Sequence, residues 1–470
     1  MKQDGKLSLI SLIGIIMSAI IGAGIFNLMK EMASVASVGA TMIGWIVTGV
    51  GMGSLALCML KLNTARPDLD AGIFSYAREG FGDYIGFNSV WGYWISVIIG
   101  NVAFGTLLFS ALGYFFPVFG DGQNIASIIG ASVLLWIIHY MLLKGLDKAA
   151  LLNAIVMLAK LIPLVIFLIC IVTAFKINLF AADFWGNNVL DGDLGSVVEQ
   201  VKGSMLVTVW VFIGIEGAVV FSGRARNRSD VGRATVLAFI AITIIYAMIT
   251  VLSFGILTRA DIASLPNPAM GYVLESIIGK TGATIVNAGV IISIFGAWIA
   301  NTLLAEEIAY QAGVQQLFPK CFTIENKNGM PAVSTFITNF LVQLLLISFL
   351  FTSEAYSVLS RLSSATILLP YACVAFFLMK EIVRKKIKAQ ITTIALGLIS
   401  TIYMLWLIIS SGYVYVVLTI LALCPGTLIY IYVKKYYKEK MFTAPEYVIL
   451  TIVGILFIYG ICNLSTLLVG

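Results

Sequence analysis

The chain has 470 residues, of which 60% are hydrophobic and only 11% are charged. A soluble protein of this length needs a larger charged share, so lipid must solvate most of this chain. The formal net charge of +6 does not indicate nucleic acid, because the basic residues lie in short loops between apolar runs. Composition therefore predicts a helical protein that crosses the lipid bilayer many times and binds no nucleic acid.

Apolar runs recur along the whole chain, and a helix needs about 20 residues to cross the roughly 30 Å of hydrocarbon in a bilayer. The first run is too long for a removed signal peptide, so it is expected to be a permanent span. The expected spans are thirteen: 8–29, 38–61, 86–117, 123–143, 149–175, 203–223, 232–257, 282–312, 332–352, 356–379, 391–410, 413–433 and 446–468.

Basic residues are distributed unevenly over the loops between these spans. With a cytoplasmic N-terminus, the inside loops hold most of them, including KEIVRKKIK (380–388) and KKYYKEK (434–440). Cytoplasmic loops of membrane proteins carry such an excess of lysine and arginine. We therefore predict a multi-pass protein of the cell (cytoplasmic) membrane with a cytoplasmic N-terminus.

The sequence offers little for catalysis. Because His139 is the single histidine, motifs that need two histidines for a metal are excluded, and His139 is expected to be a hydrogen-bonded packing residue. The segment GKT (279–281) lacks the upstream glycine of a phosphate-binding loop, so ATP-driven transport is not encoded in this chain. We predict no catalytic residue, no metal site and no cofactor.

Four ionisable residues lie deep in expected spans: Lys160, Glu216, Glu307 and Arg361. Such a group is costly at the bilayer centre unless it faces protein or water, which makes each of them a candidate for function. Glu216 lies in the glycine-interrupted segment FIGIEGA (212–218). Close helix packing through small residues would explain these glycines but not the carboxylate.

Glycines interrupt both the first span, at SAIIGAGIFN (18–27), and the sixth span, at FIGIEGA. If the first ten spans form two inverted five-helix halves, these two spans correspond, and such a pair of interruptions indicates a midplane site in a secondary transporter. Unwound backbone exposes amides that suit a carboxylate and carbonyls that suit an ammonium. Both groups occur together in an α-amino acid.

Six segments share their order and spacing with a known family: SAIIGAGIF (18–26), RPDLDAGIFSYAREGFG (66–82), WGYWISVIIGNV (91–102), TVWVFIGIEGA (208–218), RARNRSDVGRAT (224–235) and NTLLAEE (301–307). Together they resemble the amino acid–polyamine–organocation transporters. The nearest group is that of the basic amino acid/polyamine antiporters, which includes arginine/ornithine and arginine/agmatine exchangers. The similarity covers about the first 380 residues.

The resemblance implies an all-α polytopic membrane protein with the LeuT-type fold of two inverted five-helix repeats, in which helices 1 and 6 are broken. The transporter core would be residues 1–380, with repeats at roughly 1–200 and 201–380, and residues 381–470 would add three helices. The implied function is exchange of an external, cationic amino acid for a related internal product, arginine/ornithine by default. The implied partners are this amino acid, its amine or amino acid counter-substrate and the lipid bilayer, with a homodimer as a further option.

The resemblance also assigns residues to the substrate. The amides of the unwound first span would receive the substrate carboxylate: Ile21, Gly22, Ala23 and Gly24. The backbone from Trp210 through Ile213 to Gly214 would receive the ammonium, with the Trp210 ring stacked over the substrate as a gate. That ring would also attract a cationic side chain.

Two third-span residues, Ser96 and Asn101, fall at positions that line the pocket in relatives, although a serine bonded to helix backbone would give the same sequence. Lys160 matches the position at which sodium-independent relatives place an ammonium. A structural cation is the preferred role for Lys160, and proton carriage is the alternative. Glu216 would couple protonation or gating to the sixth-span break. Glu307, rather than Glu306, aligns with an acid of the arginine/ornithine branch.

Two departures from the family bear on the substrate. Asn301 stands where many relatives carry a tryptophan, and Arg361 aligns near a small polar residue that approaches the substrate. A fixed cation there would repel a cationic substrate unless Glu307 or a neighbour pairs with it. Arg361 fits an ion-paired packing residue equally well. These changes suit a smaller or less cationic substrate, such as histidine exchanged for histamine.

Two other classes of function compete with exchange. A channel would need a continuous polar pore lined by charges or carbonyls, and the expected spans contain only a few deep charges. A non-transporting amino acid sensor on a transporter scaffold would show the same sequence features. Binding without exchange would distinguish the sensor.

Overall fold

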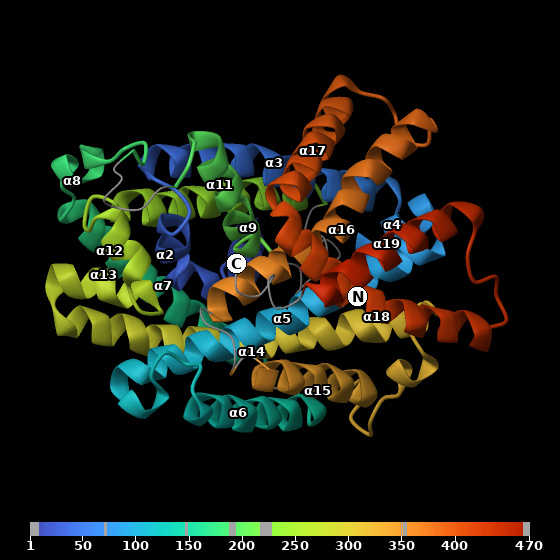
Figure 1. Ribbon diagram of the computed structural model, residues 1–470, viewed down its shortest axis with the longest axis horizontal. Helices are drawn as coiled ribbons and strands as arrows, with labels where there is room; N and C mark the ends of the chain where they lie inside the picture. The colour runs from blue at the N-terminus through green and yellow to red at the C-terminus, as the bar shows by residue number, and fades with distance from the viewer. Residues whose placement is uncertain are drawn as a thin grey trace. The chain divides into compact units, whose positions relative to one another are not determined.

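A computed structural model describes residues 9–69, 73–145, 149–187, 194–216, 228–348, 350 and 355–463, without the side chains of residues 11, 15, 18, 19, 149–159 and 228–229. Every regular element in these ranges is a helix, and none is a strand (Figure 1). The all-α fold class is therefore confirmed for the described part of the chain.

The chain divides into two compact units, of which the first comprises Met1–Thr64, Phe104–Ser127 and Lys148–Ala297. Its elements are α1 (Leu9–Ile20), η2 (Ala23–Phe26), α2 (Leu28–Ala33), α3 (Val38–Ala65), α7 (Ala149–Thr173), α8 (Ile177–Ala182), α9 (Val197–Trp210), α11 (Arg228–Ser253), α12 (Arg259–Ser264) and α13 (Ala269–Ile278). It also contains η3 (Pro117–Phe119) and the ends of three helices that continue in the second unit.

Small and hydroxyl side chains hold α3 against α9 and α11. A Cβ on Gly44 would lie 2.6 Å from Oγ of Ser204, so the α3 backbone approaches α9 at this glycine. The hydroxyls of Thr48 and Thr208 are 2.8 Å apart and form a second link between the same helices. Such small residues and buried hydrogen bonds are the usual means of joining helices when lipid surrounds them.

The second unit comprises Ala65–Ala103, Ile128–Asp147 and Trp298–Gly470. Its elements are α4 (Ile73–Phe81), most of α5 (Asp83–Phe115) and α6 (Ile125–Leu143), the second half of α14 (Lys280–Val314), η6 (Lys320–Thr323), α15 (Ala332–Ser348), α16 (Ala355–Val383), α17 (Ile391–Ser410), α18 (Gly412–Tyr436) and α19 (Ala444–Cys462). The long helices α5 and α14 thus contribute residues to both units.

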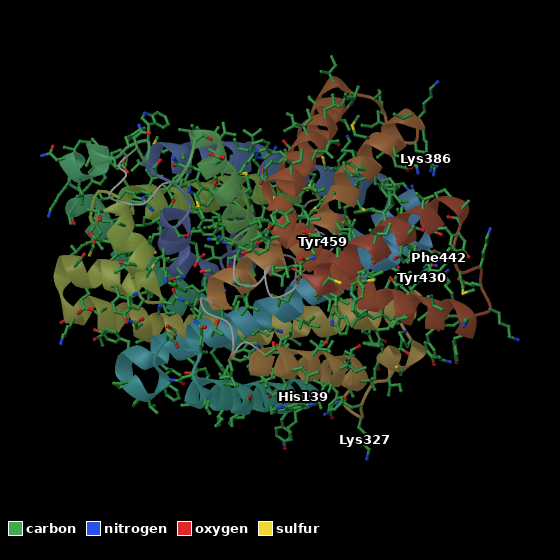
Figure 2. The ribbon with its side chains drawn as sticks, viewed as in Figure 1. His139, Lys327, Lys386, Tyr430, Phe442 and Tyr459 are labelled. Carbon is green, nitrogen blue, oxygen red and sulfur yellow. The ribbon has the colours of Figure 1, made fainter. Side chains whose placement is uncertain are left out.

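Polar side chains join α6 to α15, which lie side by side in the second unit (Figure 1). Gln343 accepts a hydrogen bond from the Trp136 ring at 3.2 Å and donates one to Ser132 at 2.8 Å. His139, labelled on α6 in Figure 2, is hydrogen-bonded through Nδ1 to Asn339 at 3.1 Å. The expectation that His139 is a hydrogen-bonded packing residue is therefore confirmed.

Nine helices in the described ranges are long and apolar enough to cross a membrane: α3, α5, α6, Asp230–Ser253 of α11, α14, α16, α17, α18 and α19. Each coincides with an expected span, and the remaining four expected spans fall on α1 with α2, on α7, on α9 and on α15. The total of thirteen spans, the two inverted repeats and the division at residue 380 stay predictions.

The first expected span is broken at its glycines, as the sequence predicted. Helix α1 ends at Ile20, Gly22 has an extended backbone with φ −94° and ψ −162°, and the short helix η2 follows. In the sixth expected span, α9 ends at Trp210 and residues 211–216 form turns. The remainder of that span, residues 217–223, lies outside the described residues.

Candidate functional site

The break in the first span lies against the end of α9 within the first unit. A Cβ on Gly24 would lie 2.6 Å from Nε1 and 2.9 Å from Cδ1 of Trp210, distances that real side chains do not adopt. Only glycine permits this approach of backbone to ring. Gly24 and Trp210, which were both assigned to the substrate site, are therefore direct neighbours.

Gly22 has different surroundings from Gly24. Its extended backbone is open to any residue, and an added Cβ would have no neighbour nearer than Ile20 O and Phe104 Cζ, both at 4.0 Å. Packing within the chain therefore does not require a glycine at this position. A small residue at this position leaves the backbone of the break accessible, because no other described part of the chain packs closely against Gly22.

Phe104 of α5, which was not among the residues predicted for the site, completes this group. Its ring packs on the buried Trp210 ring with centroids 5.9 Å apart. The available signal was its spacing, because Phe104 follows the predicted pocket residue Asn101 by three positions on one helix, and such positions are neighbours on a helix surface. An aromatic pair thus lies next to Gly22 and Gly24.

Polar side chains bind the two ends of the break. The Tyr246 hydroxyl donates to Ile20 O at 3.4 Å, where α1 ends. Asn27, where η2 ends, donates to Glu31 at 3.1 Å and accepts from the backbone N–H of Ala269 at 3.1 Å. A backbone freed from its helix needs such partners in lipid, and these bonds fix the break in place. Asn27 is a missed residue whose signal was an amide inside an apolar run.

The turn after α9 is organised around Glu216. Gly214 has a φ of +104°, a conformation that favours glycine, and its N–H donates to Oε2 of the buried Glu216 at 3.2 Å. Ile213 is half-buried in the same turn. The carboxylate therefore binds the backbone of the predicted ammonium-binding segment. Gly217, the second glycine of FIGIEGA, lies outside the described residues.

Lys160 lies on α7 in the first unit, and its side chain is buried. Burial of an ammonium requires partners that replace water, which distinguishes Lys160 from a lysine that extends to the membrane surface. Its roles as a structural cation or a proton carrier stay predictions.

Asn101 and Asn301 form an amide network within the second unit. Nδ2 of Asn301 donates to Oδ1 of Asn101 and to the carbonyl oxygen of Val97, both at 3.1 Å. Asn101 in turn donates to the Thr302 hydroxyl at 3.3 Å. The departure Asn301 is therefore bonded to a residue that was independently assigned to the pocket, and the two join α5 to α14.

Ser96 takes part in a different link, between α5 and α16. Its hydroxyl donates to the carbonyl oxygen of Ser363 at 2.8 Å, and the Ser363 hydroxyl donates back to the carbonyl oxygen of Ser96 at 2.8 Å. The bond is to the backbone of another helix, whereas the alternative considered from the sequence was the serine's own helix. Ser96 therefore contributes to helix packing, and its substrate contact stays a prediction.

The remaining assigned residues also lie in the second unit. Glu307 is exposed on α14 and accepts a hydrogen bond from Gln311 at 2.7 Å, whereas its neighbour Glu306 is buried. Arg361 is half-buried in the second turn of α16. Of these two adjacent acids the buried one is thus Glu306, and the coupling role of Glu307 stays a prediction.

The structure therefore describes two groups of assigned residues, one within each unit. The first unit holds Ile21, Gly22, Ala23, Gly24, Lys160, Trp210, Ile213, Gly214 and Glu216, and the second holds Ser96, Asn101, Asn301, Glu307 and Arg361. Within the first group, Gly24 of the first-span break lies against Trp210, and within the second group Asn301 is hydrogen-bonded to Asn101. An unwound backbone segment beside a buried aromatic pair can bind a small zwitterion.

Residues 7–410 match the family model described as Amino acid permease. The chain belongs to the amino acid permease family. It is 41% identical over 465 residues to the arginine/ornithine antiporter of Pseudomonas aeruginosa, covering 97% of this chain and 96% of the relative. It is 41% identical over 476 residues to the arginine/agmatine antiporter of Chlamydia pneumoniae, covering 99% and 98%. A putative arginine/ornithine antiporter of Escherichia coli K12 is 42% identical over 439 residues, covering 92% and 93%.

Membership of the amino acid permease family confirms the resemblance that the six sequence segments carried. This permease is a multi-pass membrane transporter, in agreement with the nine long apolar helices found in the described ranges, and it is not an enzyme. The matching region ends at residue 410, so α18 and α19 lie beyond the family model, whereas the relatives extend over them.

Proposed function

We propose that this permease is an antiporter that imports an amino acid and exports a related internal product, with arginine and ornithine as the first pair. The observation that carries the proposal is the break at Ile20–Gly24 beside Trp210, which leaves unwound backbone next to an aromatic ring. Relatives over nearly the whole chain are named arginine/ornithine and arginine/agmatine antiporters, which supports the same class of substrate.

The substrate's two backbone groups match the two ends of the proposed site. The amides from Ile21 to Gly24 would bind the carboxylate, and the carbonyls between Trp210 and Gly214 would bind the ammonium. A guanidinium or amine on the side chain would be attracted to the face of an aromatic ring such as Trp210. The substrate would thus satisfy backbone that has left its helical ladder.

A second candidate pair, histidine exchanged for histamine, rests on Asn301. Where the family resemblance provides a tryptophan, this chain has an amide that already bonds Asn101 and Val97. An amide selects for a group that can hydrogen-bond, and the half-buried Arg361 would disfavour a strongly cationic side chain unless a neighbouring acid pairs with it. The two pairs therefore differ in charge, and a transport assay can separate them.

The finer points of location and assembly belong to the same proposal. We place the permease in the cell (cytoplasmic) membrane with its N-terminus in the cytoplasm, on the strength of the basic residues in the inside loops. A homodimer stays a prediction from the family resemblance.

The substrate pair is tested with purified protein in liposomes preloaded with one candidate counter-substrate at a time. We expect internal ornithine or arginine to accelerate uptake of labelled arginine, and internal histamine to accelerate uptake of histidine if the second pair is correct. Trp210→Ala, which removes the ring, should weaken uptake of either substrate. Binding of an amino acid without acceleration by any internal substrate would support the sensor and contradict exchange.

A further inference from the structure

Glu306 is a buried carboxyl group that the proposed exchange does not use. It lies on α14 in the second unit with 2% of its surface exposed, and it contacts the Thr335 hydroxyl of α15. Among the residues that the structure describes, no lysine, arginine or histidine forms an ion pair with it. A buried carboxylate without a positive partner is strongly disfavoured, so the protonation of this group needs an explanation.

Two other buried acids, Glu381 and Glu446, have partners that can stabilise a carboxylate. Glu381 is paired with Arg66 at 2.6 Å and with Lys386 at 3.8 Å. Glu446 accepts three hydrogen bonds, from the N–H and hydroxyl of Thr443 at 2.7 and 2.8 Å and from the N–H of Tyr84 at 3.1 Å. In the described part of the chain, Glu306 has neither a cation nor several N–H donors as partners, and in this it differs from Glu381 and Glu446.

The hydrogen atoms around Thr335 can be counted. The Thr335 oxygen lies within hydrogen-bond distance of two oxygens, the carboxyl Oε2 of Glu306 and the carbonyl oxygen of Pro331, the latter at 2.7 Å. A hydroxyl has one hydrogen to donate and can accept two, whereas a carbonyl only accepts. If Glu306 were ionised, the single Thr335 hydroxyl hydrogen could bond only one of these two acceptors. The Thr335 oxygen would then face the other acceptor oxygen with no hydrogen between them.

A proton on Glu306 removes this conflict. The carboxyl O–H then donates to the Thr335 hydroxyl, which donates to the carbonyl oxygen of Pro331, and every hydrogen has one acceptor. In a medium of low dielectric constant, the hydrogen bonds of such a chain strengthen one another. The same carbonyl also accepts the backbone N–H of Thr335 at 3.0 Å, which uses its second lone pair.

The neighbouring titratable groups also disfavour a charge on Glu306. Glu307 is next to it on α14, exposed to its surroundings and able to carry a negative charge that would repel a second one. Tyr310, one turn further along α14, donates to Glu325 at 2.6 Å. On the α15 side, Asn339 lies one turn after Thr335 and binds His139 of α6.

We propose that Glu306 is a proton-binding site, protonated in this conformation and held so by Thr335. On release, the carboxyl O–H bond breaks and water accepts the proton, which leaves a carboxylate that no longer donates to α15. Protonation of Glu306 thereby controls the contact between α14 and α15. This inference concerns the proton alone and does not depend on which amino acid the permease exchanges.

The state of Glu306 can be read by infrared difference spectroscopy on the full-length protein in lipid. We expect the spectrum of wild type minus Glu306→Gln at neutral pH to contain the carbonyl-stretch band of a protonated carboxylic acid. The matched control, Glu307→Gln, should leave this band in place. A carboxylate band in the Glu306→Gln difference spectrum would overturn the proposal.

A second variant keeps the test decisive if Glu306→Gln does not fold. Thr335→Val retains Glu306 and removes the hydroxyl, so the carboxylic acid band should change its frequency in this variant and not in Thr335→Ser. Glutamine can donate to Thr335 as a protonated acid does, so we expect Glu306→Gln to fold and to lose the pH dependence that exchange shows in the wild type. A pH profile of exchange that is identical in wild type and Glu306→Gln would contradict control by this proton.

Discussion

Gly22 and Gly24 lie two positions apart in one break, yet they are glycines for different reasons. A Cβ on Gly24 would meet Nε1 of Trp210 at 2.6 Å, whereas a Cβ on Gly22 would meet nothing nearer than 4.0 Å. Trp210 cannot easily move away, because it is buried and packs against Phe104. Packing therefore accounts for Gly24 and leaves Gly22 to be explained by what binds there.

This difference predicts two distinct outcomes for the same substitution. We expect Gly24→Ala to destabilise the protein by about 1–3 kcal/mol, the usual cost of extra volume in a filled interior. Gly22→Ala should keep its melting temperature near the wild-type value and lose uptake, because its methyl group would stand beside the amides proposed for the substrate. Melting in detergent and uptake into liposomes measure the two effects, and equal losses of stability would contradict the packing argument.

Glu216 gives a second prediction at this scale. Its carboxylate accepts the N–H of Gly214 at 3.2 Å, and glutamine keeps an acceptor oxygen while removing the charge. We expect Glu216→Gln to lose no more than about 1.5 kcal/mol of stability, the usual net value of one hydrogen bond, and to impair turnover or its pH dependence. Transport that is unchanged at every pH would exclude Glu216 from coupling.

Individual side chains set the limit of what the sequence could predict. Glu306 and Glu307 are adjacent, and adjacent residues on a helix point about 100° apart, so only a structure could decide which of the two is buried. Ser96 bonds Ser363, which is 267 positions away. No local pattern encodes such a pair, because it depends on which helix happens to pack against α5.

At the scale of elements, the helices were the most predictable feature. The expected span 391–410 coincides with α17, and the first-span break falls at the predicted glycines. The length and hydropathy of a segment determine whether it forms a membrane helix, and glycine marks where the hydrogen bonding of that helix is weak. Both features can therefore be read from the local sequence. The aromatic contact of Phe104 with Trp210 could not be read in this way, because it joins α5 to α9.

Glu446 is one of several side chains that join the last helices to α5. Glu446, in the first turn of α19, caps its own helix through Thr443 and also accepts the N–H of Tyr84 at the start of α5. Close by, Tyr430 of α18 and Phe442 lie side by side, with ring centroids 5.4 Å apart (Figure 2). Residues 381–470 were expected only to add helices, and this contact gives them a role in positioning α5.

We therefore expect Glu446→Ala to cost about 2–4 kcal/mol, because it leaves the N–H groups of Thr443 and Tyr84 without their acceptor. Glu439→Ala is the control, since Glu439 is 43% exposed and Lys434 keeps Asp83 as a partner. Its cost should be smaller than that of Glu446→Ala, because the buried Lys434 ammonium is still paired with Asp83. The two variants are compared by their melting temperatures in detergent. Similar losses of stability would mean that Glu446 does not cap both α19 and the start of α5.

At the scale of the whole molecule, the permease family and the broken first span lead to the same account. The chain is similar to named antiporters over nearly its whole length, and its first-span break lies beside Trp210. Composition and span order allowed a transporter to be predicted, because apolar runs and glycine interruptions are local features. The substrate pair could not be predicted in the same way, since it depends on side chains such as Asn301 and Arg361 that lie far apart in sequence.

Uptake of labelled arginine into liposomes that contain the purified permease measures obligatory exchange directly. We expect rapid uptake when the liposomes are preloaded with ornithine or arginine and almost none when they are empty. Equal uptake into preloaded and empty liposomes would contradict exchange.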